Sequence, residues 1–74
     1  MTFNEWLKKY IPHRCQNKVM RKAGLGLNNI RRWKKGSMPN LLSIIYVSKA
    51  LAIMYGYDYK TIVLQGIKAA GNNK

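Results

Sequence analysis

Two short amphipathic patterns lie on either side of a glycine turn in residues 16–39, QNKVMRKAGLGLNNIRRWKKGSMP. Before the turn, apolar side chains recur at Cys15, Val19 and Ala23, with polar residues on the other faces. This i, i+4, i+8 spacing is typical of an amphipathic helix. Gly24 follows the last apolar position, where a left-handed glycine commonly ends a helix, and the segment after it has room only for a tight turn.

The pattern after the turn predicts a second helix with a basic outer face. Leu27, Ile30 and Trp33 form its apolar stripe, and Gly36 ends it. The remaining positions carry only amides and cations, namely Asn28, Asn29, Arg31, Arg32, Lys34 and Lys35. We therefore expect one side of this helix in the core and the other side to present hydrogen-bond donors and positive charge.

A helix before this pair is predicted by its capping residues. Thr2 and Glu5 have the spacing of a capping box, and apolar residues then recur with helical period over residues 3–10. Pro12 removes a backbone donor and disfavours helical geometry at the residue before it. The first helix should therefore end there.

Two more helices are predicted in the second half of the chain. Residues 41–47 are almost all apolar, so a strand is an alternative, but the helical pattern continues through Ala52, beyond the usual length of a strand. Asn40 can cap this helix, and Asp58 can cap a last helix that ends before Gly71.

These elements predict an all-α fold, a compact five-helix bundle that contains a helix-turn-helix. We expect residues 2–70 to form one domain and residues 71–74 a frayed polar tail, because a chain this short cannot support two cores. The predicted core consists of Phe3, Trp6, Leu7, Tyr10, Val19, Ile30, Trp33, Leu41, Ile44, Ile45 and Leu51.

Charge is the strongest functional signal in the sequence. The 74 residues include 14 Lys and Arg against two acidic residues, a formal net charge of +12. Ten of the basic residues lie between Lys8 and Lys35, and no carboxylate occurs between Glu5 and Asp58. A folded chain this small then has a positive potential over most of its surface, so we expect a polyanionic partner.

The residue types exclude several other classes of protein. One Cys and one His cannot form a disulfide framework or a four-ligand zinc site, and two distant acids do not make an acid–base pair. We expect no catalytic residue, metal, cofactor or small-molecule ligand, so the chain is not predicted to be an enzyme. No apolar stretch approaches the roughly 18 to 20 residues of a membrane span, and no secretory signal is recognisable. We therefore expect a cytoplasmic protein.

The outer face of the second helix of the pair has the chemistry to read base pairs. Amide side chains can pair with adenine, and Arg with guanine, in the major groove. The predicted base contacts are Asn28, Asn29, Arg31 and Arg32, and the predicted phosphate contacts are Gln16, Lys18, Lys34, Lys35 and Ser37. Two alternatives stay open. Both Asn residues are also favoured at helix starts, and Leu27 either packs in the core or touches a thymine methyl.

From Gln16 to Ile53 the sequence resembles the lambda-repressor-like, Cro-type helix-turn-helix family. The residues that carry the resemblance are Gln16, Val19, Ala23-Gly24, Ile30, Trp33, Gly36, Pro39, Leu41 and Ala50-Leu51. The sequence departs from the family at Met20, which stands where a small Ala is usual, and at Gly26, which replaces a Ser or Thr cap. Because Met20 is larger, we expect a changed angle between the two helices or a compensating gap.

The resemblance implies a protein that binds double-stranded DNA with its third helix, as a homodimer on a palindromic site. It further implies a small prokaryotic or phage transcription regulator, repressor-like and located at the nucleoid. The aromatic cluster between Met54 and Tyr59 would suit a two-fold self-contact. The high charge also favours an alternative, an architectural or recombination accessory protein of excisionase-like or nucleoid-associated type. A basic RNA-binding module is a third possibility.

Overall fold

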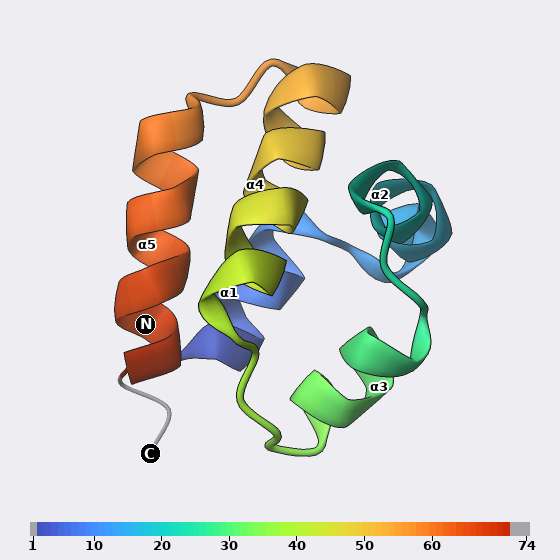
Figure 1. Cartoon of the computed structure of the whole chain (residues 1–74), viewed down its shortest axis with the longest axis vertical. Helices are drawn as coiled ribbons and strands as arrows, with labels where there is room; N and C mark the ends of the chain where they lie inside the picture. Colours follow the sequence, from blue (N-terminus) through green and yellow to red (C-terminus); the bar gives the residue numbers. More distant parts are fainter. Residues whose placement is uncertain (1, 72–74) are drawn as a thin grey trace.

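Five α-helices and one short 3₁₀ turn make up the computed structural model, which describes residues 2–71 (Figure 1). Along the chain they are α1 (Phe3–Tyr10), η1 (His13–Cys15), α2 (Gln16–Ala23), α3 (Asn28–Lys34), α4 (Leu41–Tyr55) and α5 (Tyr59–Gly71). The prediction of an all-α bundle is confirmed, and residues 41–47 are helical. Gly71 is the last residue of α5, whereas residues 72–74 of the predicted tail lie outside the described residues.

Side-chain caps set where α1 and α4 begin. Glu5 N donates to Thr2 Oγ1 at 3.2 Å and Thr2 N donates to Glu5 Oε1 at 2.9 Å, which is the predicted capping box. Asn40 Oδ1 accepts a hydrogen bond from Ser43 N at 2.8 Å. Each cap satisfies a backbone N–H that the first turn of a helix leaves without a partner.

Both acidic residues of the chain act as helix caps. The backbone amide of Thr2, and then its hydroxyl, lower the pKa of Glu5 by hydrogen bonding to the carboxylate. At the start of α5, Asp58 Oδ2 accepts from Thr61 Oγ1 at 2.6 Å and from Thr61 N at 3.1 Å, and these bonds lower the pKa of Asp58. The two carboxylates therefore serve the backbone of their own helices.

The turn between α2 and α3 is made by a left-handed glycine, as the sequence predicts. Gly24 has φ = 77°, and Leu25 N donates to the carbonyl of Met20 at 2.9 Å. This 6→1 bond is the mark of a Schellman stop, which L residues other than glycine rarely permit. Residues 24–27 then carry the chain to α3, which runs below α2 in the view of Figure 1.

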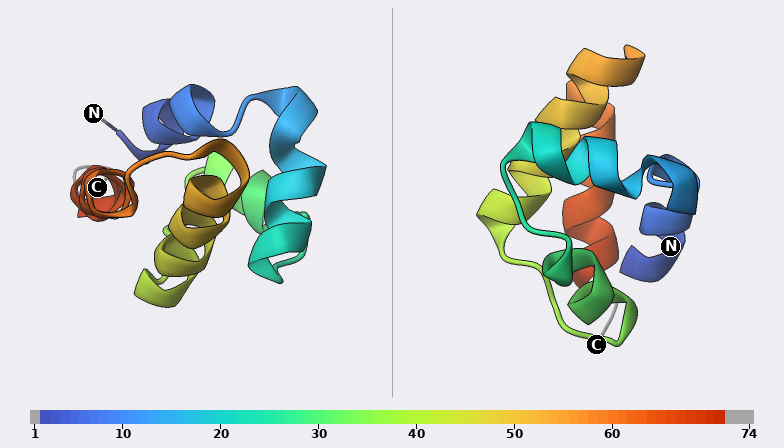
Figure 2. Two further views of the ribbon diagram at one scale, coloured as in Figure 1. Left: turned by 90° about the horizontal axis from the view of Figure 1, so that it is seen from above. Right: turned by 90° about the vertical axis from the view of Figure 1, so that its right-hand side faces the viewer.

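The helices pack around the aromatic residues of α1. α4 and α5 lie side by side and antiparallel, and α1 packs against α5 (Figures 1 and 2). Trp6 is fully buried, stacks on Phe3 at a centroid distance of 5.2 Å, and donates from Nε1 to the carbonyl of Ile62 at 3.2 Å. Gly66 lets α5 approach closely, because a Cβ at this position would lie 2.9 Å from Ile44 Cγ2.

The structure buries all but two of the predicted core residues. Leu41, the first residue of α4, is 56% exposed, whereas Ser43 and Ile44 in the same turn are buried. Ile45 is half-buried, since the buried stripe of α4 passes through Ile44, Val47, Ser48 and Leu51. The core prediction is therefore wrong at these two positions.

Candidate nucleic-acid interface

The third helix, α3, is held by one face and exposed on the opposite one. Ile30 and Trp33 are 2% and 5% exposed, and the Trp33 ring meets Phe3 of α1 edge-on at 5.6 Å. Around the helix, the positions opposite this stripe carry Asn28, Arg31, Arg32 and Lys35, and all four are exposed. The predicted inward and outward sides of this helix are therefore present, apart from Leu27.

Leu27 does not belong to the buried stripe. It precedes the first residue of α3, is 40% exposed, and lines a hollow between α2 and α3. The packing interpretation is therefore wrong, although the backbone of Leu27 is helical and its carbonyl accepts from the amide of Ile30 at 3.1 Å. An exposed aliphatic side chain at the start of α3 is available to an apolar surface of a ligand.

Asn29 differs from its predicted companions because it is hydrogen-bonded within the chain. Its Nδ2 donates to the carbonyl of Gly26 at 3.0 Å, and its Oδ1 accepts from Arg32 Nη2 at 2.7 Å. Both ends of the amide are thus occupied, and the side chain is only half exposed. In this arrangement the amide of Asn29 is bonded to the guanidinium of Arg32 and can hold it in place.

Two polar hollows flank α3, one on each side. The first, the α2-side hollow, has a volume of about 330 Å³ and is lined by His13, Gln16, Asn17, Leu27, Ile30, Arg31 and Lys34. The second, the α4-side hollow, has a volume of about 460 Å³ and is lined by Asn29, Arg32, Trp33, Ser37, Met38, Asn40 and Ser43. Arg31 therefore lines the hollow on one flank of α3, and Arg32 lines the hollow on the opposite flank.

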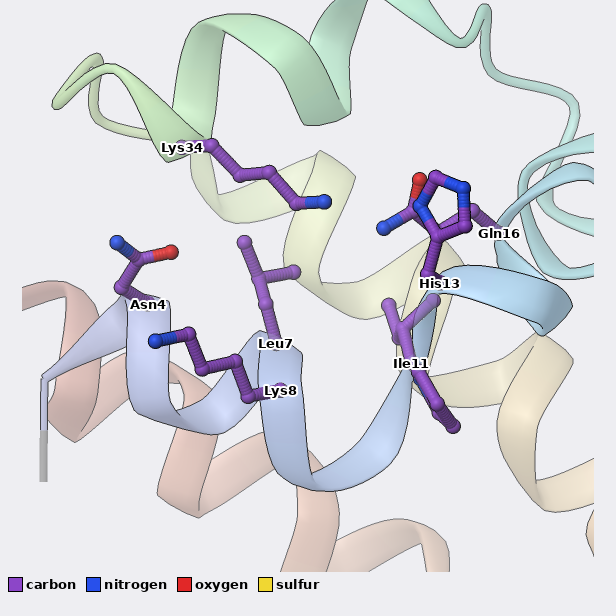
Figure 3. Close-up of a pocket in the computed structure, with 8 residues that line it drawn as sticks. Asn4, Leu7, Lys8, Ile11, His13, Gln16 and Lys34 are labelled. Carbon is purple, nitrogen blue, oxygen red and sulfur yellow. The ribbon is translucent and has the colours of Figure 1, made fainter.

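A third hollow continues the basic surface from α3 onto α1. Figure 3 shows the side chain of Lys34 extending from α3 over Leu7 toward His13 and Gln16, with Lys8 on the side of α1. The volume of this hollow is about 370 Å³. Lys34 borders both this hollow and the α2-side hollow, so its ammonium group lies between two sets of polar side chains.

The predicted phosphate contacts are not all brought together. Gln16 and Lys34 line the α2-side hollow, Ser37 lines the α4-side hollow, and Lys35 is exposed at the end of α3. Lys18 lies apart from them, in a groove that it shares with residues of α4. Successive residues of a helix are about 100° apart, so Lys18 faces away from the side of α2 that borders α3.

Sequence reasoning missed Asn17 and Asn40, which stand beside the predicted phosphate contacts. Asn17 is in the first turn of α2 and lines the same hollow as Gln16, and Asn40 caps α4 beside Ser37. Their positions at helix starts are readable from the sequence. Which hollow they line depends on how α2 and α4 sit against α3.

Within residues 2–71, no three or more His, Cys, Asp or Glu side chains are grouped so as to hold a metal ion. None of the described helices is long and apolar enough to cross a membrane. Amides, hydroxyls and cations, together with the His13 imidazole and the exposed Leu27, are the groups that α3 and its flanks offer to a partner.

Comparison with known proteins adds no family assignment. No protein-family model, no curated protein and no solved structure matches the chain.

Proposed function

We propose that this chain is a sequence-specific protein that binds double-stranded DNA, with α3 in the major groove. The observation that carries the proposal is the division of α3 into a buried side, Ile30 and Trp33, and an exposed basic side between two polar hollows. An α-helix with its side chains is about 10–12 Å across, a size suited to a groove about 12 Å wide.

Each exposed residue of α3 would make a different contact with the base pairs. Arg31 and Arg32 would each offer two donors to guanine O6 and N7, and Asn28 would pair with adenine. Asn29 would act through Arg32, because their 2.7 Å hydrogen bond fixes the guanidinium. Leu27 would contact a thymine methyl group at the edge of the α2-side hollow.

Phosphate groups would occupy the hollows beside α3. Gln16 and Lys34 would hold one strand on the α2 side, and Ser37 and Asn40 the other strand on the α4 side. Lys35 would add a contact at the end of the helix. Phosphate contacts of this kind supply affinity that falls with salt, whereas base contacts supply the sequence preference.

In biological terms we propose a small transcription regulator of repressor-like type that acts on prokaryotic or phage DNA, at the nucleoid. The resemblance to the lambda-repressor-like family supports this role, as does the arrangement of α2, turn and α3. We further propose a homodimer on a palindromic site. Exposed aromatic residues at the end of α4, Tyr55 at 44% and Tyr57 at 41%, offer a surface for self-contact.

The test is selection of bound duplexes from a pool of random sequences. The proposal expects a defined motif in which two inverted half-sites lie about 34 Å apart, one turn of the duplex. An Arg31→Ala variant should then select a motif that is relaxed at one base pair of each half-site. Recovery of no motif from the unaltered protein would refute sequence-specific binding.

One observation favours the alternative of an architectural or recombination accessory protein. Exposed cations also lie away from α3, including Lys22 on α2, Lys49 on α4 and Lys60 and Lys68 on α5. A protein that coats or bends DNA would use such a distributed charge. Its footprint would spread as the protein concentration rises, whereas a repressor would protect a fixed palindrome.

A further inference from the structure

A second basic surface lies away from α3, between α2 and the C-terminal half of α4. It is an open groove of about 470 Å³ lined by Lys18, Arg21, Lys22, Ile53 and Met54, and we call it the basic–apolar groove. Figures 1 and 2 place α3 near the opposite, N-terminal end of α4. A ligand in this groove would therefore not occupy the face that we assign to base reading.

The apolar part of the groove is unusually exposed for a small helical protein. Ile53 is 70% exposed, the largest fraction among the exposed large apolar side chains, and Met54 packs against the core beside it. Leu42 and Tyr46, 57% and 43% exposed, lie on the same side of α4 as Ile53, with the exposed Lys49 between Tyr46 and Ile53. Single exposed apolar residues are ordinary, but Ile53 lies in a hollow beside three cations, so a partner there can make both apolar and charged contacts.

The cationic part of the groove has no counter-charge within residues 2–71. The two acidic residues of the chain are Glu5 and Asp58, and hydrogen bonds at the starts of α1 and α5 occupy both carboxylates. A second copy of this chain would bring only two acidic residues with a net charge of +12, so its approach would be opposed by repulsion. We therefore expect the negative charge that complements Lys18, Arg21 and Lys22 to come from a different molecule.

We propose that the basic–apolar groove docks an acidic segment of another protein, one in which carboxylates alternate with aliphatic side chains. Carboxylates would pair with the three cations on α2, and an aliphatic side chain would cover Ile53. A DNA backbone would satisfy the cations but leave Ile53 in water, which is why we assign the groove to protein. This inference does not depend on the reading of DNA by α3.

The probe is a fluorescently labelled synthetic peptide of glutamate and leucine, with the leucines at helical spacing, measured by anisotropy without DNA. A peptide with alanine in place of each leucine is its partner probe. We expect Ile53→Ser to weaken binding of the leucine peptide about tenfold, as loss of one buried aliphatic contact implies. The matched control is Leu64→Ser on α5, which removes an apolar side chain of similar exposure, 57%, outside the groove.

The contribution of charge is tested with a second matched pair of variants. Arg21→Glu with Lys22→Glu should abolish peptide binding, and Lys60→Glu with Lys68→Glu, which changes the net charge equally, should preserve most of it. Circular dichroism and thermal melting check that each variant is folded, and Lys22→Gln serves if the double reversal on α2 is not. Sequence preference for DNA should be the same in the groove variants as in the unaltered protein.

Three results would overturn the proposal. The first is equal binding of the leucine and alanine peptides, or equal weakening by Ile53→Ser and Leu64→Ser. The second is displacement of the peptide by random duplex DNA whose affinity falls in the α2 variant but not in the α5 variant, which would make the groove a nucleic-acid surface. The third is binding to anionic lipid vesicles that requires Ile53, which would make it a membrane surface.

Discussion

Replacement of Gly66 by alanine should destabilise this protein, although the same change in an ordinary helix interior is stabilising. Alanine is favoured over glycine by about 1 kcal/mol in helices. Here the added Cβ would lie 2.9 Å from Ile44 Cγ2 and 3.1 Å from Trp6 Cε2 and Cζ2. Comfortable separations between carbon atoms are about 3.5–4.0 Å, so α5 or its neighbours must move by roughly half an ångström.

The neighbours of Gly66 have little freedom to move. Trp6 stacks on Phe3, and its Nε1 donates to the carbonyl of Ile62 on α5 itself, so a shift of α5 away from the ring also stretches this 3.2 Å bond. Overpacking of this kind costs about 1–3 kcal/mol. After the gain of about 1 kcal/mol in helix propensity is subtracted, we expect Gly66→Ala to lower the free energy of unfolding by up to about 2 kcal/mol.

The assay is thermal unfolding followed by circular dichroism, with Gly71→Ala as the matched control in the same helix. Within residues 2–71, no atom lies within 4 Å of a Cβ at Gly71 apart from the adjoining residues and the nearby backbone of α5. We expect Tm to fall by up to about 16 °C for Gly66→Ala and to stay equal or rise for Gly71→Ala. Equal or greater stability of Gly66→Ala than of the control would refute the close packing of α5 on Trp6.

Three further perturbations follow from individual side chains. Ser48 is fully buried and its hydroxyl has no hydrogen-bond partner among the described residues, so Ser48→Ala should raise the free energy of unfolding by about 0.5–1.5 kcal/mol in denaturant titration, and a loss would contradict this. Because hydrogen bonds lower the pKa of Glu5 and Asp58 in the folded state, their contribution to stability is full above the ordinary values of 4.5 and 3.8 and is lost as pH falls through the lowered ones. Melting between pH 6 and pH 2 should therefore show a steeper acid decline for the unaltered protein than for the Glu5→Gln, Asp58→Asn double variant. Finally, Asn29→Ala should relax sequence preference at the base pair that Arg32→Ala affects, and a new relaxed position in the selected motif would show that Asn29 reads a base on its own.

The parts of the fold that depend on local chemistry could be predicted from the sequence. Thr2, Asn40 and Asp58 mark helix starts because their side chains bond to backbone groups three residues away. Gly24 marks the turn because its left-handed φ is rarely adopted by other residues. Such signals involve neighbours in the chain, so they can be read without knowledge of the packing.

The parts that depend on how helices meet could not be predicted. Leu27 and Leu41 continue apolar patterns of their helices but are exposed. Periodicity alone cannot show which positions of a helix are buried by a neighbouring helix. Lys18 was grouped with the phosphate contacts, yet it lines the basic–apolar groove with Ile53. The angle that Met20 was expected to change stays a prediction, although the structure buries this side chain.

The most direct test of DNA reading by α3 compares affinities for the selected duplex and for random duplex in three variants. Arg31→Ala should reduce the difference in binding free energy between the two duplexes by about 1–3 kcal/mol, because it removes a base contact. Lys35→Ala should weaken both affinities alike and reduce the slope of log affinity against log salt concentration by about one. Lys68→Ala on α5 should change the ratio of the two affinities little. An unchanged ratio in Arg31→Ala would contradict the assignment of base reading to the exposed side of α3.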